Sequence, residues 1–158
     1  MLRPYNYRAE EESYVFYTST KQKYFFYFLD ITDYYKQLNP VLQSNVYEFS
    51  FFPEKNIKSK KDPRIAKTLT IAIKRILAKN PNAIIGFTCD SLDQKEDSRK
   101  RLFHNWFIEF NNKDIVKLDK SITSDEISLH RSIIFMKTNT DGRQNIEHAF
   151  FKLGLDLR

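Results

Sequence analysis

The stretch that most constrains the fold is a helical pattern at residues 62–80, followed at once by a continuous apolar run at residues 83–89. Asp62 is a good N-cap, Pro63 suits the first helical position, and Asn-Pro at 80–81 ends the pattern. The run AIIGFTC is short and apolar throughout, which is typical of a central strand covered on both faces. A long helix leading into a central strand predicts a crossover and therefore a parallel strand pair.

Three segments rich in aromatic and β-branched residues precede that helix and predict strands. Residues 13–18 and 23–31 are joined by a short polar link and predict a hairpin, and residues 45–52 predict a third strand. Almost every residue of 23–31 is apolar, so we expect both faces of this strand to be covered. A short helix near 33–38 and a loop fill the interval between the second and third strands.

The second half of the chain predicts two more helices and two more strands. Asp93 with Glu96 three residues later resembles a capping box, which predicts a helix that ends near residues 111–112. The remaining expected elements are strands at 115–118 and 127–138, a turn at 139–142 and a helix at 144–153. The order βββ-α-β-α-ββ-α predicts a single α+β domain over residues 1–158. Its core is a mixed, mostly antiparallel, twisted sheet with helices packed on it.

Glycine and cysteine usage excludes several classes of protein. The glycines are Gly86, Gly142 and Gly154, and none of them cluster, which argues against dinucleotide-binding loops and P-loops. The single cysteine, Cys89, cannot form an internal disulfide. The first residues have no apolar core and no run approaches the length of a membrane span. We therefore expect a cytoplasmic protein without a membrane partner.

The histidines do not predict a metal site. His104, His130 and His148 have no ligand spacing relative to one another, and none neighbours Cys89 in a ligand pattern. A Ser-His-Asp arrangement stays open, because such triads assemble in space rather than along the sequence.

The positive charge of the chain is concentrated in one place. The net charge is +6, and residues 55–80 hold nine lysines and arginines against one aspartate. Such a run is typical of a solvated helix face, and it is also a possible basic patch for an anionic partner. The nine tyrosines fall within residues 5–47, so exposed aromatic side chains near this patch would suit a nucleic acid. The candidate nucleic-acid-binding residues are Lys55, Lys58, Lys60, Lys61, Arg64 and Lys67. The same aromatic residues would also suit core packing or a homodimer interface.

The end of the apolar run carries the weak candidates for catalysis. Cys89 and Asp90 stand at the carboxyl end of an expected central strand, where ligand crevices of open sheets lie. His104 follows on the next helix and is the other acid–base candidate. Alternatively, Asp90 pairs with Arg99 or Arg101 and only ties the strand to that helix, and we favour this structural interpretation.

Several stretches, namely YVFYT, YFFYFLDI, NVYEFSFF, DPRIAKTL and CDSLDQKEDSRKRLFHNWF, resemble a family of small bacterial proteins of unassigned function. The resemblance runs from about Tyr14 to Phe107 and more weakly to the C-terminus. It implies no activity.

The order of elements is also similar to the core of Gcn5-related acetyltransferases. That resemblance implies that acyl-CoA pyrophosphate binds a glycine-containing turn before the first core helix, at residues 53–68 here. This turn has no glycine, Pro63 removes an amide donor, and Asp62 occupies the place of the anion. An active enzyme would hold the phosphates of acetyl-CoA with Lys58, Lys60, Lys61 and Arg64.

We therefore expect a degenerate acetyltransferase-like domain without a cofactor, which acts by binding a macromolecule or by self-association. The alternatives are an active N-acyltransferase with a lysine-rich phosphate loop and a nucleic-acid-binding module.

Overall fold

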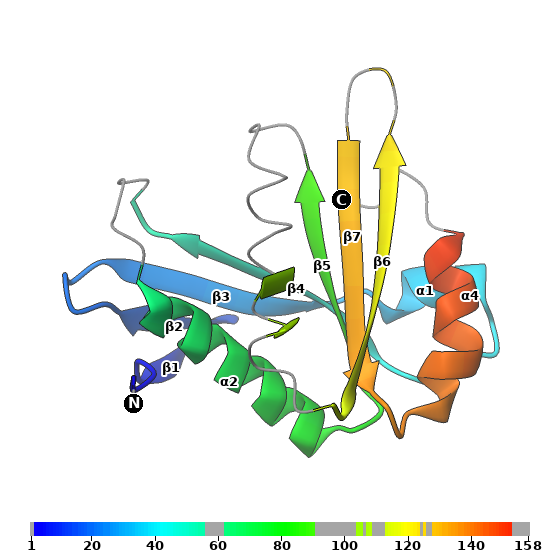
Figure 1. Ribbon diagram of the computed structural model, residues 1–158, viewed down its shortest axis with the longest axis horizontal. Helices are drawn as coiled ribbons and strands as arrows, with labels where there is room; N and C mark the ends of the chain where they lie inside the picture. The colour runs from blue at the N-terminus through cyan, green and yellow to red at the C-terminus, as the bar shows by residue number, and fades with distance from the viewer. Residues whose placement is uncertain are drawn as a thin grey trace.

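The computed structural model describes residues 2–55, 62–90, 104–105, 107–108, 113–123, 125 and 128–152. These residues form a seven-stranded sheet with helices on both faces (Figure 1). The expected α+β class is confirmed. In chain order the elements are β1 (Tyr7–Glu10), β2 (Ser13–Tyr17), β3 (Lys23–Asp30), α1 (Thr32–Leu38), β4 (Val46–Pro53), α2 (Pro63–Lys79), β5 (Ile84–Asp90), β6 (Ile115–Thr123), β7 (Ser128–Met136), the π-helix η1 (Gly142–Ile146) and α4 (Glu147–Phe151).

The strand order in the sheet is β1-β2-β3-β4-β5-β7-β6. β4 and β5 are parallel, and every other neighbouring pair is antiparallel. α2 is the crossover that joins the parallel pair, because an antiparallel hairpin cannot return the chain in the same direction. β5 lies between β4 and β7, so the apolar run is a central strand, as its composition predicts.

The parallel strands β4 and β5 stay together over a short distance only. They pair from Val46 opposite Ile84 to Glu48 opposite Gly86. Beyond that point β4 remains paired with β3 and β5 with β7, and the two strands diverge (Figure 1). The sheet is therefore split between its two central strands toward their carboxyl ends.

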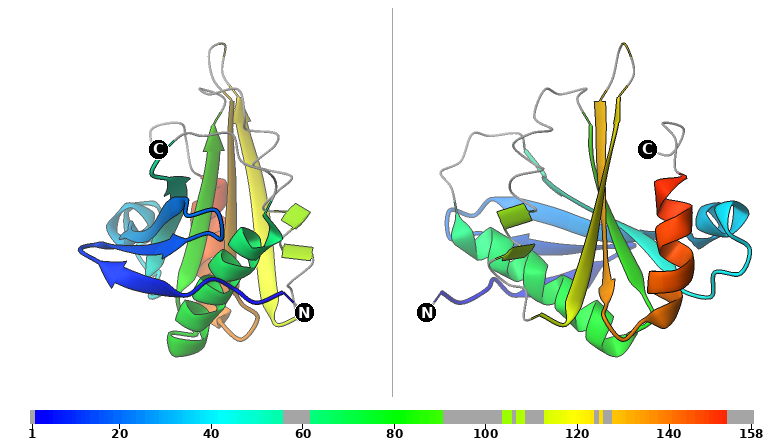
Figure 2. Two further views of the ribbon diagram at one scale, coloured as in Figure 1. Left: turned by 90° about the vertical axis from the view of Figure 1, so that its left-hand side faces the viewer. Right: turned by 45° about the vertical axis from the view of Figure 1, so that its right-hand side comes forward.

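α2 covers one face of the sheet. It begins where the sequence predicts because Asp62 caps its first turn, and it ends at Asn80, whose N–H donates to the Ile76 carbonyl. Its apolar side packs on aromatic side chains from β2, β3, β4 and β5, and α1 lies on the opposite side of the strands (Figure 2). The buried members of this core are Tyr5, Phe16, Tyr24, Phe26, Phe49, Leu69, Ala72, Ile73, Leu77, Ala83, Ile85, Phe87 and Ile134.

The other face is covered by α1, η1 and α4 over β5 and β7. Tyr35 of α1 and Phe150 of α4 pack with Ile133 and Phe135 of β7 in a second core. A Cβ on Gly142 would lie 2.8 Å from the Phe135 ring, so glycine allows η1 to approach this strand closely.

In the described part of the chain, no helix packs over β2 and β3 on the face that α1 and α4 cover elsewhere. Leu29 is 56% exposed there. The expectation that both faces of residues 23–31 are covered is therefore wrong. Aromatic side chains of neighbouring strands pack against one another on this face, so the strand can be apolar without a covering helix.

Other differences are local. β1 was not predicted, β6 continues to Thr123 rather than ending at residue 118, and Gly142 belongs to a helix rather than a turn. Residues 104–105 and 107–108 are helical, while most of the helix expected from Asp93 lies outside the described residues. Within the described chain, no helix combines the length and apolar character needed to cross a membrane.

Candidate functional site

The predicted junction after β5 is only partly described. Cys89 and Asp90 end this strand, opposite His130 and Leu129 of β7. Arg99 lies outside the described residues, as does Arg101, so the expected pairing with Asp90 remains a prediction.

The predicted basic segment is likewise divided. Lys58, Lys60 and Lys61 lie outside the described residues. Lys55 is exposed just after β4, and Lys67 is half-buried on the first turns of α2.

The N-terminus of α2 is where the acetyltransferase resemblance would place the pyrophosphate of acyl-CoA. It is occupied by the protein's own groups. Asp62 accepts a hydrogen bond from the Arg64 N–H at 2.9 Å and another from the Tyr5 hydroxyl at 2.6 Å. The Arg64 guanidinium lies 3.9 Å from the centre of the Tyr5 ring, and its Nε donates to the Arg3 carbonyl at 2.7 Å. The Tyr5 N–H donates to Thr68 Oγ1 at 2.8 Å, which fixes the N-terminal segment against the helix. A carboxylate therefore already fills the electropositive end of α2.

A buried ion pair lies where β4 and β5 separate. Arg131 of β7, 1% exposed, donates from Nη2 to Glu48 Oε2 of β4 at 2.8 Å. The Thr88 hydroxyl of β5 donates to the other Glu48 oxygen. A Cβ on Gly86 would lie 3.0 Å from Glu48 Oε2, so this glycine makes room for the carboxylate.

Tyr35 belongs to the same face and is fully buried. Burial raises the pKa of its hydroxyl to about 12, although the positive charge of Arg131 acts in the opposite direction. The phenol therefore stays protonated at neutral pH. Sequence reasoning missed this cluster because Tyr35, Glu48 and Arg131 are far apart in the chain.

An exposed group of large side chains lies on the uncovered face of β2, β3 and β4. We call it the open aromatic face: Tyr17, Phe25, Tyr27, Leu29 and Phe52. Phe25 and Phe52 stack with ring centres 5.3 Å apart, and Tyr17, Leu29 and Phe52 are 47%, 56% and 46% exposed.

Charges of both signs surround the open aromatic face. Lys23 Nζ lies 4.8 Å from the Phe25 ring centre and pairs with Glu10 at 3.2 Å and Glu54 at 3.7 Å. The hydrogen bond to Glu10 is the main reason why the pKa of Lys23 is raised. Arg8 adds a further positive charge beside Glu10.

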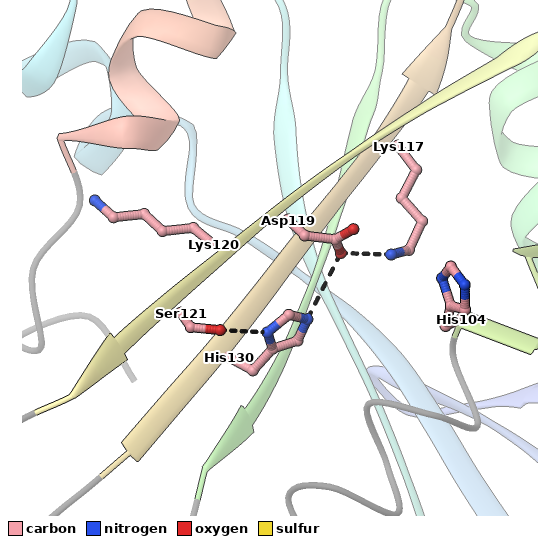
Figure 3. A pocket seen from close by; sticks show the side chains of 6 residues that line it. All are labelled: His104, Lys117, Asp119, Lys120, Ser121 and His130. Carbon is pink, nitrogen blue, oxygen red and sulfur yellow. Dashed lines mark hydrogen bonds and ion pairs between the residues drawn. The ribbon is translucent and has the colours of Figure 1, made fainter.

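The other face of β6 and β7 carries a polar pocket of about 380 Å³ near their loop end (Figure 3). His104 and His130 both line this pocket, although they are far apart in the sequence. His130 is buried and lies between Ser121 and Asp119, whereas His104 is exposed on the opposite side. His148 is exposed on α4 and lies elsewhere. No group of three or more potential metal ligands occurs among the described residues.

The comparisons with known proteins agree with the sequence resemblance at the level of the family only. No curated protein and no solved structure matches the chain. Residues 61–152 match the model of a family of unknown function, DUF6169. The match spans α2 to α4, including the crossover, the central strand β5 and the polar pocket. Because it covers more than half of the sequence, the chain belongs to this family of unknown function, DUF6169.

Proposed function

We propose that the chain is an acetyltransferase-like domain that acts by self-association rather than by acyl transfer. The crossover by α2 into the central strand β5 agrees with the order of elements on which the acetyltransferase-like resemblance rests. Fold alone carries no activity, so the function has to be argued from surfaces and sites.

The open aromatic face is the observation that carries self-association. Large exposed side chains on neighbouring strands are rare on a monomer surface unless they serve an interface. Tyr and Phe are enriched at the centres of such interfaces, where they bury much area with few torsions. Here three strands present four aromatic side chains and Leu29 side by side, and Tyr17, Leu29 and Phe52 are exposed.

A second copy of the chain is the partner that fits this face best. A two-fold interface brings one patch against itself, so the patch must be self-complementary. Arg8 and Lys23 lie beside Glu10 and Glu54, which allows opposite charges to meet across the axis. A nucleic acid would meet two carboxylates at the same place, which disfavours phosphate contacts.

Light scattering after size exclusion, over a concentration series, tests the proposal. We expect a dimer for the natural sequence. Phe52→Ser or Leu29→Ser should weaken dimerisation by roughly 30-fold, because truncating a central interface side chain costs about 2 kcal/mol. Val41→Ser is the matched control, since Val41 is 63% exposed but lies outside this face. A monomer at the highest concentrations, or equal effects of all three variants, would reject the proposal.

A second candidate, acyl-CoA-dependent transfer, is favoured by the split of the sheet alone. The diverging parts of β4 and β5 have backbone groups that do not bond to each other and would suit an extended amide-containing ligand. Against it, Asp62, Tyr5 and Arg64 close the N-terminus of α2.

Thermal unfolding with and without coenzyme A and acetyl-CoA separates the two candidates. A ligand at 100 times its Kd would add about 2.7 kcal/mol of stability. We expect no change in the Tm of the natural sequence at millimolar ligand. The comparison variant is Asp62→Ala, which removes the carboxylate from the N-terminus of α2. A concentration-dependent rise in Tm for the natural sequence would establish the acyl-CoA candidate instead.

A further inference from the structure

The polar pocket aligns a serine, a histidine and an aspartate. Ser121 is hydrogen-bonded to His130, and His130 lies at ion-pair distance from Asp119. Ser121 and Asp119 lie on β6, and His130 lies on β7 (Figure 3). The strand register places Ser121 directly opposite His130, so the two residues share one face of the sheet. Because β6 is an edge strand, Ser121 is exposed while His130 is buried.

The distances suit transfer of a proton from the serine to the histidine. Ser121 Oγ lies 3.0 Å from His130 Nδ1, within hydrogen-bond reach. His130 Nε2 faces Asp119 Oδ1 at 3.6 Å and the Ser132 hydroxyl at 3.4 Å. With a proton on Nε2 toward Asp119, Nδ1 presents its lone pair to the serine hydroxyl.

Asp119 is held in its ionised form. Burial alone raises the pKa of its carboxyl, but hydrogen bonds from Lys117 and Ser132 outweigh burial, so the pKa lies below its ordinary value. The carboxylate thus remains negative beside the imidazole at neutral pH. It can hold the ring in one orientation and stabilise the charge that forms when Nδ1 takes a proton.

The pocket is lined by charged residues of both signs. Lys117 and Lys120 line it together with the single carboxylate of Asp119, and His104 lies on the opposite side. Lys117 donates a hydrogen bond to Asp119 in the pocket, whereas the Lys120 side chain points to the other face of the sheet and donates to the Phe151 carbonyl of α4 (Figure 3). The positive charge of Lys117 favours a substrate on which negative charge develops during reaction.

We propose that Ser121 is a nucleophile toward acyl donors, with His130 as its general base and Asp119 as a residue that positions His130. The substrate class is an ester or thioester whose acyl group fits the pocket. Ser121 Oγ bonds to the acyl carbon while its proton moves to His130 Nδ1. The carbon–oxygen or carbon–sulfur bond then breaks, and the leaving group departs with the electron pair and the proton from His130. Water releases the acid from the acyl-serine by the same route.

This activity goes beyond self-association and does not depend on it. The pocket lies on the face of the sheet that α2 covers in part, whereas the open aromatic face lies on the other. A monomeric protein with a reactive Ser121 would support the nucleophile and reject self-association. A dimer without a reactive Ser121 would do the opposite.

Incubation of the full chain with p-nitrophenyl acetate tests the nucleophile. We expect intact-mass spectra to gain one acetyl group and peptide mapping to place it on Ser121. Ser121→Ala should lose this adduct, and His130→Gln should slow its formation about 100-fold, since a general base contributes at least that factor. Thr123→Ala is the control, because Thr123 lies on the same strand and face and is also exposed.

Asp119→Asn tests the positioning role through the pH profile of acetylation, which a purely structural role of Asp119 would not shift. Losing the carboxylate should lower the midpoint of the pH profile of acetylation, since the negative charge favours the protonated imidazole. Thermal melts verify that each variant folds, and Ser121→Ala changes only an exposed hydroxyl. Absence of an adduct on Ser121, equal rates on Ser121 and Thr123, or an unchanged rate in folded His130→Gln would each overturn the proposal.

Discussion

At the scale of single residues, the ion pair of Glu48 and Arg131 is the interaction that links the central strands. Charged side chains are expensive to bury, and they persist when each compensates the other. Here the pair joins β4 to β7 across β5, at the point where the two central strands separate. It therefore holds together the part of the sheet where backbone pairing stops.

Glu48→Gln should destabilise the protein by about 3–5 kcal/mol, because it removes one partner of a buried ion pair. Thr88→Val removes one hydrogen bond to the same carboxylate and should cost only about 1 kcal/mol. Urea unfolding at neutral pH measures both. The double change Glu48→Gln with Arg131→Met should recover stability relative to Glu48→Gln alone. A Glu48→Gln protein within about 0.5 kcal/mol of the natural one would contradict this account.

At the scale of elements, sequence patterns predicted those that carry their own start and stop residues. α2 has a cap at Asp62 and a stop at Asn80, so its bounds followed from the sequence. β5 begins with an apolar run because it is central, and the burial of Ile84, Ile85 and Phe87 confirms this. β1, in contrast, is a four-residue edge strand with two exposed residues, Arg8 and Ala9, and leaves no periodic pattern.

The sequence did not reveal the sites in the same way. Glu48 and Arg131 each resemble surface residues in the sequence, and their pairing depends on a strand register that is not visible in it. The predicted strand at 115–118 stops short of the polar end of β6, where Asp119 and Ser121 interrupt the apolar pattern. They do so because they line a pocket rather than a core. The residues of the candidate sites were therefore not recognisable from the sequence, because they lie where the local pattern conflicts with the local structure.

At the scale of the whole molecule, the two faces of the sheet have three differently covered areas. One face is covered in part by α2 and ends in the polar pocket, and the other is covered by α1 and α4 over β5 and β7. The remaining area, over β2, β3 and β4, is the open aromatic face. Binding of a second copy there would leave the pocket accessible, so association and chemistry can coexist.

Asp141 joins two distant segments of the molecule and predicts how the fold responds to acid. It accepts hydrogen bonds from the N–H of Gln43 at 3.1 Å, the N–H of Ser44 at 2.7 Å and the side-chain amide of Asn145 at 2.7 Å. Burial raises the pKa of its carboxyl, but these bonds and one from the Ser44 hydroxyl lower it below the ordinary 3.8. A depressed pKa in the folded state means that the stabilisation is present above the unfolded pKa. It is lost as pH falls through the lower folded pKa.

We therefore expect the free energy of unfolding, measured by urea at a series of pH values, to fall below about pH 4, near the unfolded pKa of an aspartate. Asp141→Asn should cost about 2 kcal/mol at neutral pH, as expected for hydrogen bonds to a charged group. The same variant should lose less stability than the natural protein on acidification, because one linked proton is gone. Asp125→Asn, at an exposed position, is the control and should follow the natural curve. Parallel curves for Asp141→Asn and the natural protein would show that the carboxylate of Asp141 does not link the two segments through its charge.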